Sequence, residues 1–175
     1  MITTTLNAIR EHDPCADGWK KLLKTLGKTQ ADAEPISLGA ILESNGLDDA
    51  IWCLRTIEGY DKEIWHFAIE CARDVQYLMQ DGRSVNALDV SERYINGTAT
   101  QSELITAKYA ARSAAYATYT AYAARSAAYA AYATCTTYTP DAAKYAAYSA
   151  RFAADAAADA NIREKQTARF IEMFG

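Results

Sequence analysis

Residues 110–135 repeat one 13-residue phrase, and this repeat limits the possible folds more than any other feature of the chain. The letters AARSAAY begin at Ala110 and again at Ala123. Alanine has the highest helix propensity of all residues, so both copies are predicted to be helical. Because 13 residues are not a whole number of helical turns, the repeat spreads its tyrosines around the helix. A helix that is apolar on every side is buried on most sides, so the repeat predicts an interior helix.

Start and stop signals divide this half of the chain into two long helices. Thr100 and Glu103 have the spacing of a capping box, in which each residue bonds the backbone of the other. No helix breaker follows until Pro140, so the first helix is predicted to reach that point and to measure about 50 Å. Asp141 then opens a second helix. Residues 100–175 are therefore predicted to form a long antiparallel hairpin rich in alanine and tyrosine.

Residues 1–99 carry helix signals at almost every boundary and almost no alternation with period two. Caps such as Ser37 precede apolar runs with helical spacing, and glycines such as Gly46 follow them. The predicted helices run from Thr5 to Glu11, Asp17 to Gly27, Ser37 to Gly46, Asp48 or Asp49 to Gly59, Asp61 to Gly82 and Ser84 to Gly97. Short helices with short connections indicate a small bundle. We therefore predict an all-α fold in which the 1–99 bundle and the 100–175 hairpin pack as one compact unit.

Composition argues against several classes of protein. A net charge of −4 with 23% charged residues is not typical of a nucleic-acid binder, which would show a basic face. The arginines and many hydroxyl groups of the alanine-rich half argue against a membrane span. The N-terminal segment has no apolar core of signal-peptide length, so we expect a cytoplasmic protein. The four scattered cysteines are then expected to be reduced thiols, most of them buried.

No pattern in the chain specifies a cofactor, a metal ion or a catalytic set. Glycine-rich phosphate loops and CxxC pairs are absent from the sequence. His12 and Cys15 have the spacing of half a metal site, but the other half would need distant residues such as His66. The same three residues would have to gather for a thiol nucleophile with a histidine base. We therefore expect no metal, no cofactor and no enzymatic activity.

The tyrosines between Tyr109 and Tyr148 allow two interpretations. They either fill the core and ordinary surface, or they leave one face free as a rigid binding surface. An arginine in such a face can stack on rings and hold a carboxylate or phosphate in a fork, or it can simply reach solvent. The face can also pair with itself, so a homodimer is a further hypothesis. The candidate binding residues are Arg112, Tyr116, Tyr119, Arg125, Tyr129 and Tyr132.

Three stretches of the sequence resemble a known group of proteins. They read HDPCADGWKKLLKTLGKT, ILESNGLDDAIWCLRTIEGYDKEIWHFAIECA and ERYINGTATQSELITAKYAARSAAYAT. The group contains alanine-rich hypothetical proteins of phages and bacteria, and part of it is similar to immunity proteins of bacterial polymorphic-toxin systems. The most specific part of the similarity is the motif from Gly46 to Ala50 followed by Cys53-Leu54-Arg55. The resemblance implies a small non-enzymatic protein that binds and neutralises a target, and it assigns no catalytic residues.

Two functional hypotheses follow. The leading one is an inhibitor, either an immunity protein or a phage counter-defence factor, that neutralises a toxin or host defence protein by stoichiometric binding. The alternative is a protein that sequesters a small nucleotide-like ligand between arginines and tyrosines of the alanine-rich helices. A deep pocket lined by Arg112 or Arg125 would favour the alternative, whereas a flat and filled face would count against it.

Overall fold

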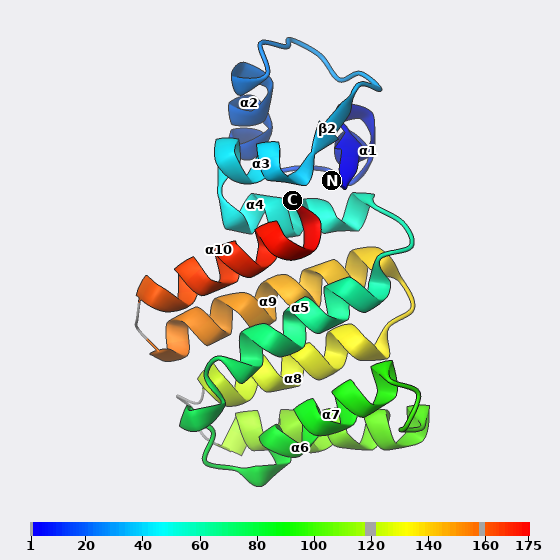
Figure 1. The fold of residues 1–175 in the computed structure, drawn as a ribbon, viewed down its shortest axis with the longest axis vertical. Coiled ribbons are helices and arrows are strands. Elements are labelled where there is room, and N and C mark those ends of the chain that lie inside the picture. Colours follow the sequence, from blue (N-terminus) through cyan, green and yellow to red (C-terminus); the bar gives the residue numbers. More distant parts are fainter. Residues whose placement is uncertain (1, 118–121, 158–159) are drawn as a thin grey trace.

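The computed structural model describes residues 2–117, 122–157 and 160–175, and the fold is all-α as predicted (Figure 1). Two single turns of 3₁₀ helix, Leu54–Thr56 and Gln76–Leu78, follow α4 and α5. The α-helices of the described residues are α1 (Leu6–Glu11), α2 (Ala16–Thr25), α3 (Leu38–Asn45), α4 (Leu47–Cys53), α5 (Asp61–Arg73), α6 (Gly82–Ile95), α7 (Gln101–Ala117), α8 (Tyr122–Cys135), α9 (Thr139–Ala157) and α10 (Ala160–Phe174).

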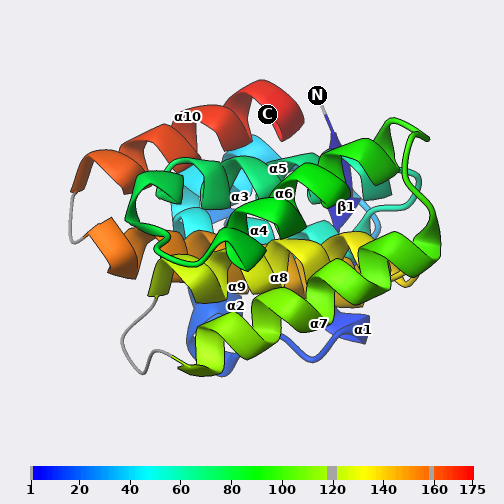
Figure 2. The same cartoon turned by 90° about the horizontal axis from the view of Figure 1, so that it is seen from below.

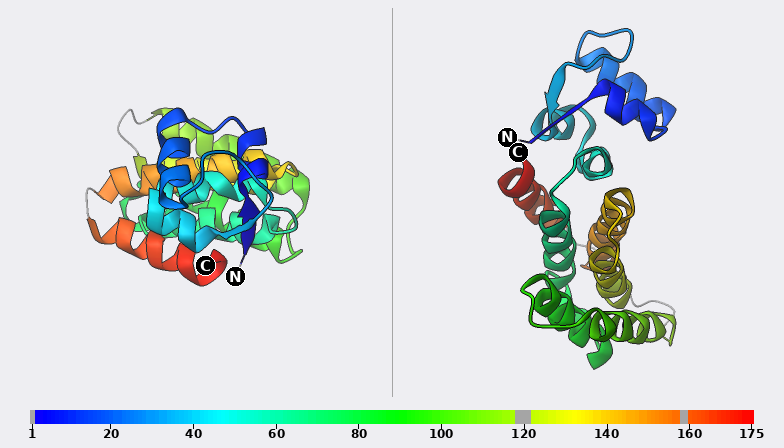
Figure 3. Two further views of the ribbon diagram at one scale, coloured as in Figure 1. Left: turned by 90° about the horizontal axis from the view of Figure 1, so that it is seen from above. Right: turned by 90° about the vertical axis from the view of Figure 1, so that its right-hand side faces the viewer.

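The longer helices form two layers. α10, α5 and α6 lie side by side in one layer, and α9, α8 and α7 lie side by side in the other (Figures 2 and 3). α8 occupies the centre, because it contacts α7 and α9 within its own layer and α5 and α6 across the interface. The prediction of an interior helix is therefore confirmed for the second copy of the repeat. The first copy lies on α7, at the edge of its layer.

The short N-terminal elements cover one end of the two layers. They include a two-stranded antiparallel sheet of β1 (Thr3–Thr5) and β2 (Pro35–Ser37), which the sequence did not predict. Each strand has three residues, too few to show a period of two, and the pairing joins segments about 30 residues apart. Both chain termini lie close together near this end (Figures 1 and 3).

One large cluster of buried side chains runs through the molecule and contains residues of both predicted segments. Phe67 of α5 lies edge-on to Phe170 and Phe174 of α10, with ring centroids 6.0 Å apart in each pair. All three rings are fully buried. Alanines of α8 and α9 extend the same cluster, so their small side chains bring the two layers close together.

The prediction of one uninterrupted helix from Thr100 to Pro140 is wrong. Arg112 of α7 donates a hydrogen bond to Tyr132 of α8, 20 residues along the chain, so the two helices run antiparallel. In a continuous helix these residues would be about 30 Å apart. High alanine content stabilises helices of any length, so it does not set the end of α7. That end is decided by the burial gained when the alanine faces of α7 and α8 pack together. The second predicted helix is likewise divided into α9 and α10.

The antiparallel hairpin at Pro140 is confirmed, with α8 and α9 as its arms. Ser126 of α8 donates to the carbonyl of Ser149 of α9 at 2.9 Å, which fixes the antiparallel pairing. Proline is tolerated at the first turn of a helix because its missing N–H would lack an intrahelical partner there. α9 accordingly starts at Thr139, two residues earlier than the predicted start at Asp141.

Several predicted helix ends are confirmed by their caps. Thr5 and Ser37 accept the expected bonds from Ala8 and Ala40. Thr100 and Glu103 form the capping box, because the Thr100 N–H donates to Glu103 at 2.7 Å and the Glu103 N–H donates to Thr100 at 3.2 Å. Gly27, Gly46 and Gly97 follow their helices with positive φ, a backbone conformation that strains residues with a Cβ.

Other predicted boundaries are wrong where side chains from distant helices decide them. α5 ends at Arg73, well before Gly82, because Arg73 binds Glu92 of α6 and Asp74 binds Arg169 of α10. These contacts turn the chain although its sequence keeps a helical pattern.

Residues near helix starts were also misassigned. The Sγ atom of Cys15, rather than Asp17, caps α2 by accepting from the Gly18 N–H. α4 begins at Leu47, before the predicted aspartates, and gives way to 3₁₀ helix at Leu54. α6 begins at Gly82 with Asp81 as its cap, not at Ser84, which is fully buried.

Candidate functional site

A groove lined by arginines and tyrosines crosses the outer face of α7, α8 and α9, on the side away from α5, α6 and α10. Its volume is about 540 Å³. We call it the Arg–Tyr groove. Its lining residues are Arg112, Ala115 and Tyr116 of α7, Arg125, Ala128, Tyr129 and Tyr132 of α8, and Tyr145 and Phe152 of α9.

Alanine and tyrosine separate to opposite sides of these helices. The alanines of α8 are buried against the other helices, whereas most tyrosines of the region are exposed or half-buried on the outer face. Tyr116 is 71% exposed and Tyr109 is 53% exposed. The described tyrosines of this region therefore do not fill the core but lie at the surface. Methyl side chains let the helix backbones approach each other closely. The tyrosine rings are too large to fit between the helices and remain on the outer face.

The 13-residue repeat places the same pair of residues on both sides of the groove. Each copy contains an arginine and a tyrosine four positions apart, which lie on one face of a helix. In the first copy they are Arg112 and Tyr116 of α7, and in the second Arg125 and Tyr129 of α8. Because α7 and α8 run antiparallel, the two pairs face a common groove.

Four rings form a row on the outer face, over the line of contact between α8 and α9. Phe152 lies parallel to Tyr129, with centroids 5.3 Å apart and an interplanar angle of 0°. Tyr122 stacks on Phe152 at 6.0 Å, and Tyr145 stacks on Tyr129 at 6.1 Å. The rings come alternately from the two helices, so each is held in place by its neighbours. Partial burial raises the pKa of Tyr129 above its ordinary value, so this phenol stays neutral and can donate a hydrogen bond at physiological pH.

Three cations lie against the rings. Arg112 donates to the Tyr132 hydroxyl at 3.2 Å, and this bond holds the pKa of Arg112 above its ordinary value. The guanidinium of Arg125 lies 5.6 Å from the centre of the Phe152 ring, and Lys108 lies 4.9 Å from that of Tyr132. In the part of the chain that the structure describes, no carboxylate lies within ion-pair distance of Arg112, Arg125 or Lys108.

The structure brings five of the six candidate residues together in this groove, and the sixth, Tyr119, lies outside the described residues. Sequence reasoning missed Tyr145 and Phe152 of α9. The phrase AKYAA occurs at residues 107–111 and 143–147, and this was a signal that α9 carries a related tyrosine. Nothing in the sequence marks Phe152.

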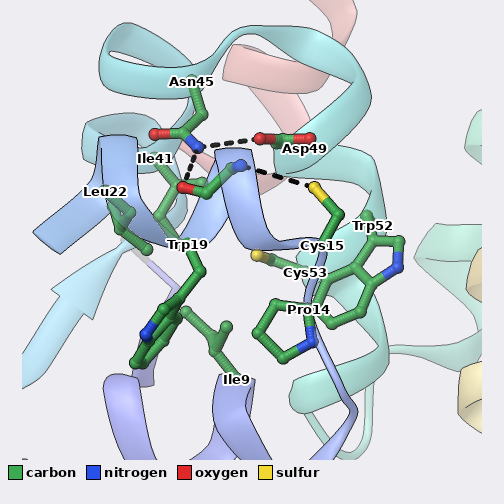
Figure 4. A pocket seen from close by; sticks show the side chains of 11 residues that line it. Ile9, Pro14, Cys15, Trp19, Leu22, Ile41, Asn45, Asp49, Trp52 and Cys53 are labelled. Atoms are coloured by element: carbon green, nitrogen blue, oxygen red, sulfur yellow. Dashed lines mark hydrogen bonds between the residues drawn. The ribbon is translucent and has the colours of Figure 1, made fainter. Parts of the chain in front are cut away.

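A second, smaller pocket of about 80 Å³ lies beside Cys15, between α2 and α4 (Figure 4). The amide of Asn45 donates to Asp49 and to the carbonyl of Gly18, which joins these helices. Neither His12 nor His66 lines this pocket. Burial raises the pKa of Cys53, on the pocket wall, to about 12, and this thiol is therefore unreactive at neutral pH.

Within residues 2–117, 122–157 and 160–175, no three His, Cys, Asp or Glu side chains gather as metal ligands. No helix of the described chain is both long and apolar enough to cross a membrane.

No protein-family model matches the chain, and neither a curated protein nor a solved structure matches it. The resemblance to immunity proteins therefore stays a prediction, and function has to be inferred from the chemistry of the groove.

Proposed function

We propose that the protein acts by binding rather than catalysis, as an inhibitor that neutralises a toxin or host defence protein by stoichiometric association. The observation that carries this proposal is the Arg–Tyr groove, where exposed rings surround two guanidinium groups that have no carboxylate partner among the described residues. Exposed rings, and guanidinium groups that have no carboxylate beside them, are available to bind another molecule.

The composition of the groove supports a binding role. Tyrosine and arginine are enriched in protein interfaces and dominate their binding energy. They add contact area and hydrogen bonds at low conformational cost when they are already held in place. Here Tyr129 is fixed between Phe152 and Tyr145, and Arg112 is fixed by Tyr132. A partner therefore meets a preorganised surface.

The experiment that tests this function compares partner capture by three tagged proteins from a bacterial host lysate. Wild type is expected to retain one protein in near-stoichiometric amount. Arg125→Glu with Tyr129→Ala should weaken the purified complex by at least about 30-fold, since loss of even one central interface residue costs at least about 2 kcal/mol and the two effects need not add. Tyr77→Ala is the matched control, because Tyr77 is 75% exposed but does not line the groove.

The circular dichroism of each variant shows whether it is still folded. Equal binding by the folded double variant would show that the groove is not the binding surface. The binding site would then have to be sought in residues 1–99. Loss of binding in the Tyr77 control would show that the capture depends on exposed tyrosine in general.

A second candidate function, sequestration of a small nucleotide-like ligand, is favoured by one specific observation. The groove is concave and both Arg112 and Arg125 line it. Its volume of about 540 Å³ falls within the range of about 300–1,000 Å³ found for small-molecule sites. In the capture experiment this function gives a released small molecule and no stoichiometric protein.

A further inference from the structure

The floor of the Arg–Tyr groove is made of methyl groups. Ala115 of α7 and Ala128 of α8 line it, and both are at least nine-tenths buried. The large side chains of α7, α8 and α9 stand around them, so the concavity exists because two positions between the rings are alanine.

The groove offers an anion two guanidinium groups. Arginine presents a planar fork that matches the oxygens of a phosphate, and such charge-assisted pairs are stronger than neutral hydrogen bonds. Arg112 is held by Tyr132 and Arg125 lies over Phe152, so both are positioned in advance. Lys108 adds charge on the same side, 4.9 Å from the Tyr132 ring.

The groove offers a planar ring one open aromatic face. Tyr116 stands on α7 and is mostly exposed, whereas Tyr129 of α8 is already stacked between Phe152 and Tyr145. Nucleic-acid bases stack on an open ring such as Tyr116 whatever their sequence, since every base has a π-face. A ligand that joins a flat ring to a phosphate would use both Tyr116 and the arginines.

We propose that the Arg–Tyr groove binds a single nucleotide, with its phosphate between Arg112 and Arg125 and its base stacked on Tyr116. This inference rests on the groove being the binding surface and names the ligand class of the second candidate function. It is separate from the inhibitor function, which needs only the exposed rings and charges.

The neighbouring surface favours one nucleotide over a nucleic-acid strand. A larger concavity, of about 760 Å³, is lined by Tyr148 and Arg151 of α9 together with Asp48 and Arg163. Its arginines already have partners, since Arg163 forms an ion pair with Asp48 and Arg151 lies 4.0 Å from Asp155. A strand leaving the Arg–Tyr groove would meet these carboxylates, whereas a mononucleotide stays among the unpaired cations. The net charge of −4 also opposes a long polyanion.

Titration calorimetry with three probes tests the proposal on the whole 175-residue chain. Adenosine 5′-monophosphate (AMP) carries both recognition elements, adenosine lacks the phosphate, and ribose 5-phosphate lacks the base. AMP is expected to bind at one site per chain, at least about tenfold more tightly than either fragment, because each fragment loses one set of contacts.

Variants then assign the contacts. Arg112→Gln with Arg125→Gln should weaken AMP binding by at least about tenfold and reduce its dependence on salt. Ala128→Leu should block the groove without any change of charge. Arg83→Gln is the matched control, because Arg83 is exposed, forms an ion pair with Asp81 and does not line the groove. A thermal melt shows whether each variant is folded.

Three outcomes would overturn the inference. AMP and the corresponding guanosine and uridine monophosphates do not bind, or inorganic phosphate binds as tightly as AMP, or a ten-nucleotide single-stranded RNA binds much more tightly than AMP. If nucleotides fail while protein capture still depends on Arg125 and Tyr129, the inhibitor function stands alone. If both experiments fail, the groove is not a binding surface.

Discussion

Identical residues of the two repeat copies have different environments. Ser113 of the first copy is exposed on α7, whereas Ser126 of the second is fully buried where α8 crosses α9. Ser126 donates to the Ser149 carbonyl, and Ser149 donates to the carbonyl of Ala68 in α5. The sequence predicted that both serines are helical but not which one is buried, because burial depends on the neighbours of each helix.

A leucine at each serine tests this difference. Ser126→Leu should lower the free energy of unfolding by about 1–3 kcal/mol, because the larger side chain has to be forced into a tight crossing. Ser113→Leu, the same change at the matching position, should alter it by less than about 0.5 kcal/mol. Urea denaturation followed by circular dichroism measures both. Equal effects would mean that the two copies share one environment and that α8 is not central.

Among the elements, the sequence predicted helix type well and helix ends unevenly. The caps at Thr5, Ser37 and Thr100 were predictable because their hydrogen bonds are made within four residues of sequence. The end of α5 at Arg73 was not, since it depends on Glu92 and on α10. Likewise, no proline or glycine lies between α7 and α8 in the sequence to mark the end of one helix and the start of the next. Such boundaries are decided by packing between elements.

The capping box gives α7 a pH dependence of known sign. The Thr100 N–H and hydroxyl, with Arg93, lower the pKa of Glu103 from 4.5 to about 2. A carboxylate with a lowered pKa in the folded state stabilises it above its unfolded pKa, and this contribution is lost as the pH falls towards the folded value. Wild type should therefore be more stable than Glu103→Ala at pH 7, and the difference should shrink between about pH 4.5 and pH 2.

Thermal melts of both proteins across this pH range measure the effect. Glu172→Ala, at an exposed position of α10, is the control for a general loss of one negative charge. A difference between wild type and Glu103→Ala that stays constant down to pH 2 would show that the carboxylate makes no charge-dependent contribution to the cap.

At the scale of the whole molecule, the all-α class was predictable from alanine content and caps, but the layering was not. Periodicity shows which face of a helix is apolar, not which of several helices covers it. The alanine-rich helices are nearly uniform, so their own sequence hardly distinguishes α5 from α6 as a partner. The prediction of the candidate site from the sequence was limited in the same way. Five of its residues were predicted from composition, whereas the groove that joins them depends on the antiparallel packing of α7 and α8.

The Phe67–Phe170–Phe174 contact tests whether the two predicted segments unfold as one unit. All three tryptophans of the chain, Trp19, Trp52 and Trp65, precede residue 100. Phe170→Ala changes only the last helix and should lower the free energy of unfolding by about 3–5 kcal/mol through the cavity it leaves. Ile171→Ala, next to it but 53% exposed, should cost less than about 1 kcal/mol.

Urea denaturation followed by both tryptophan fluorescence and circular dichroism decides the question. If one core unites the chain, Phe170→Ala shifts both transitions to the same lower urea concentration, although no tryptophan lies on α10. A fluorescence transition that stays at the wild-type midpoint while the circular dichroism shifts would show that residues 1–99 unfold independently. We expect the two transitions to coincide because α5, a helix of the first segment, is packed between α10 and α6 and against α8 and α9.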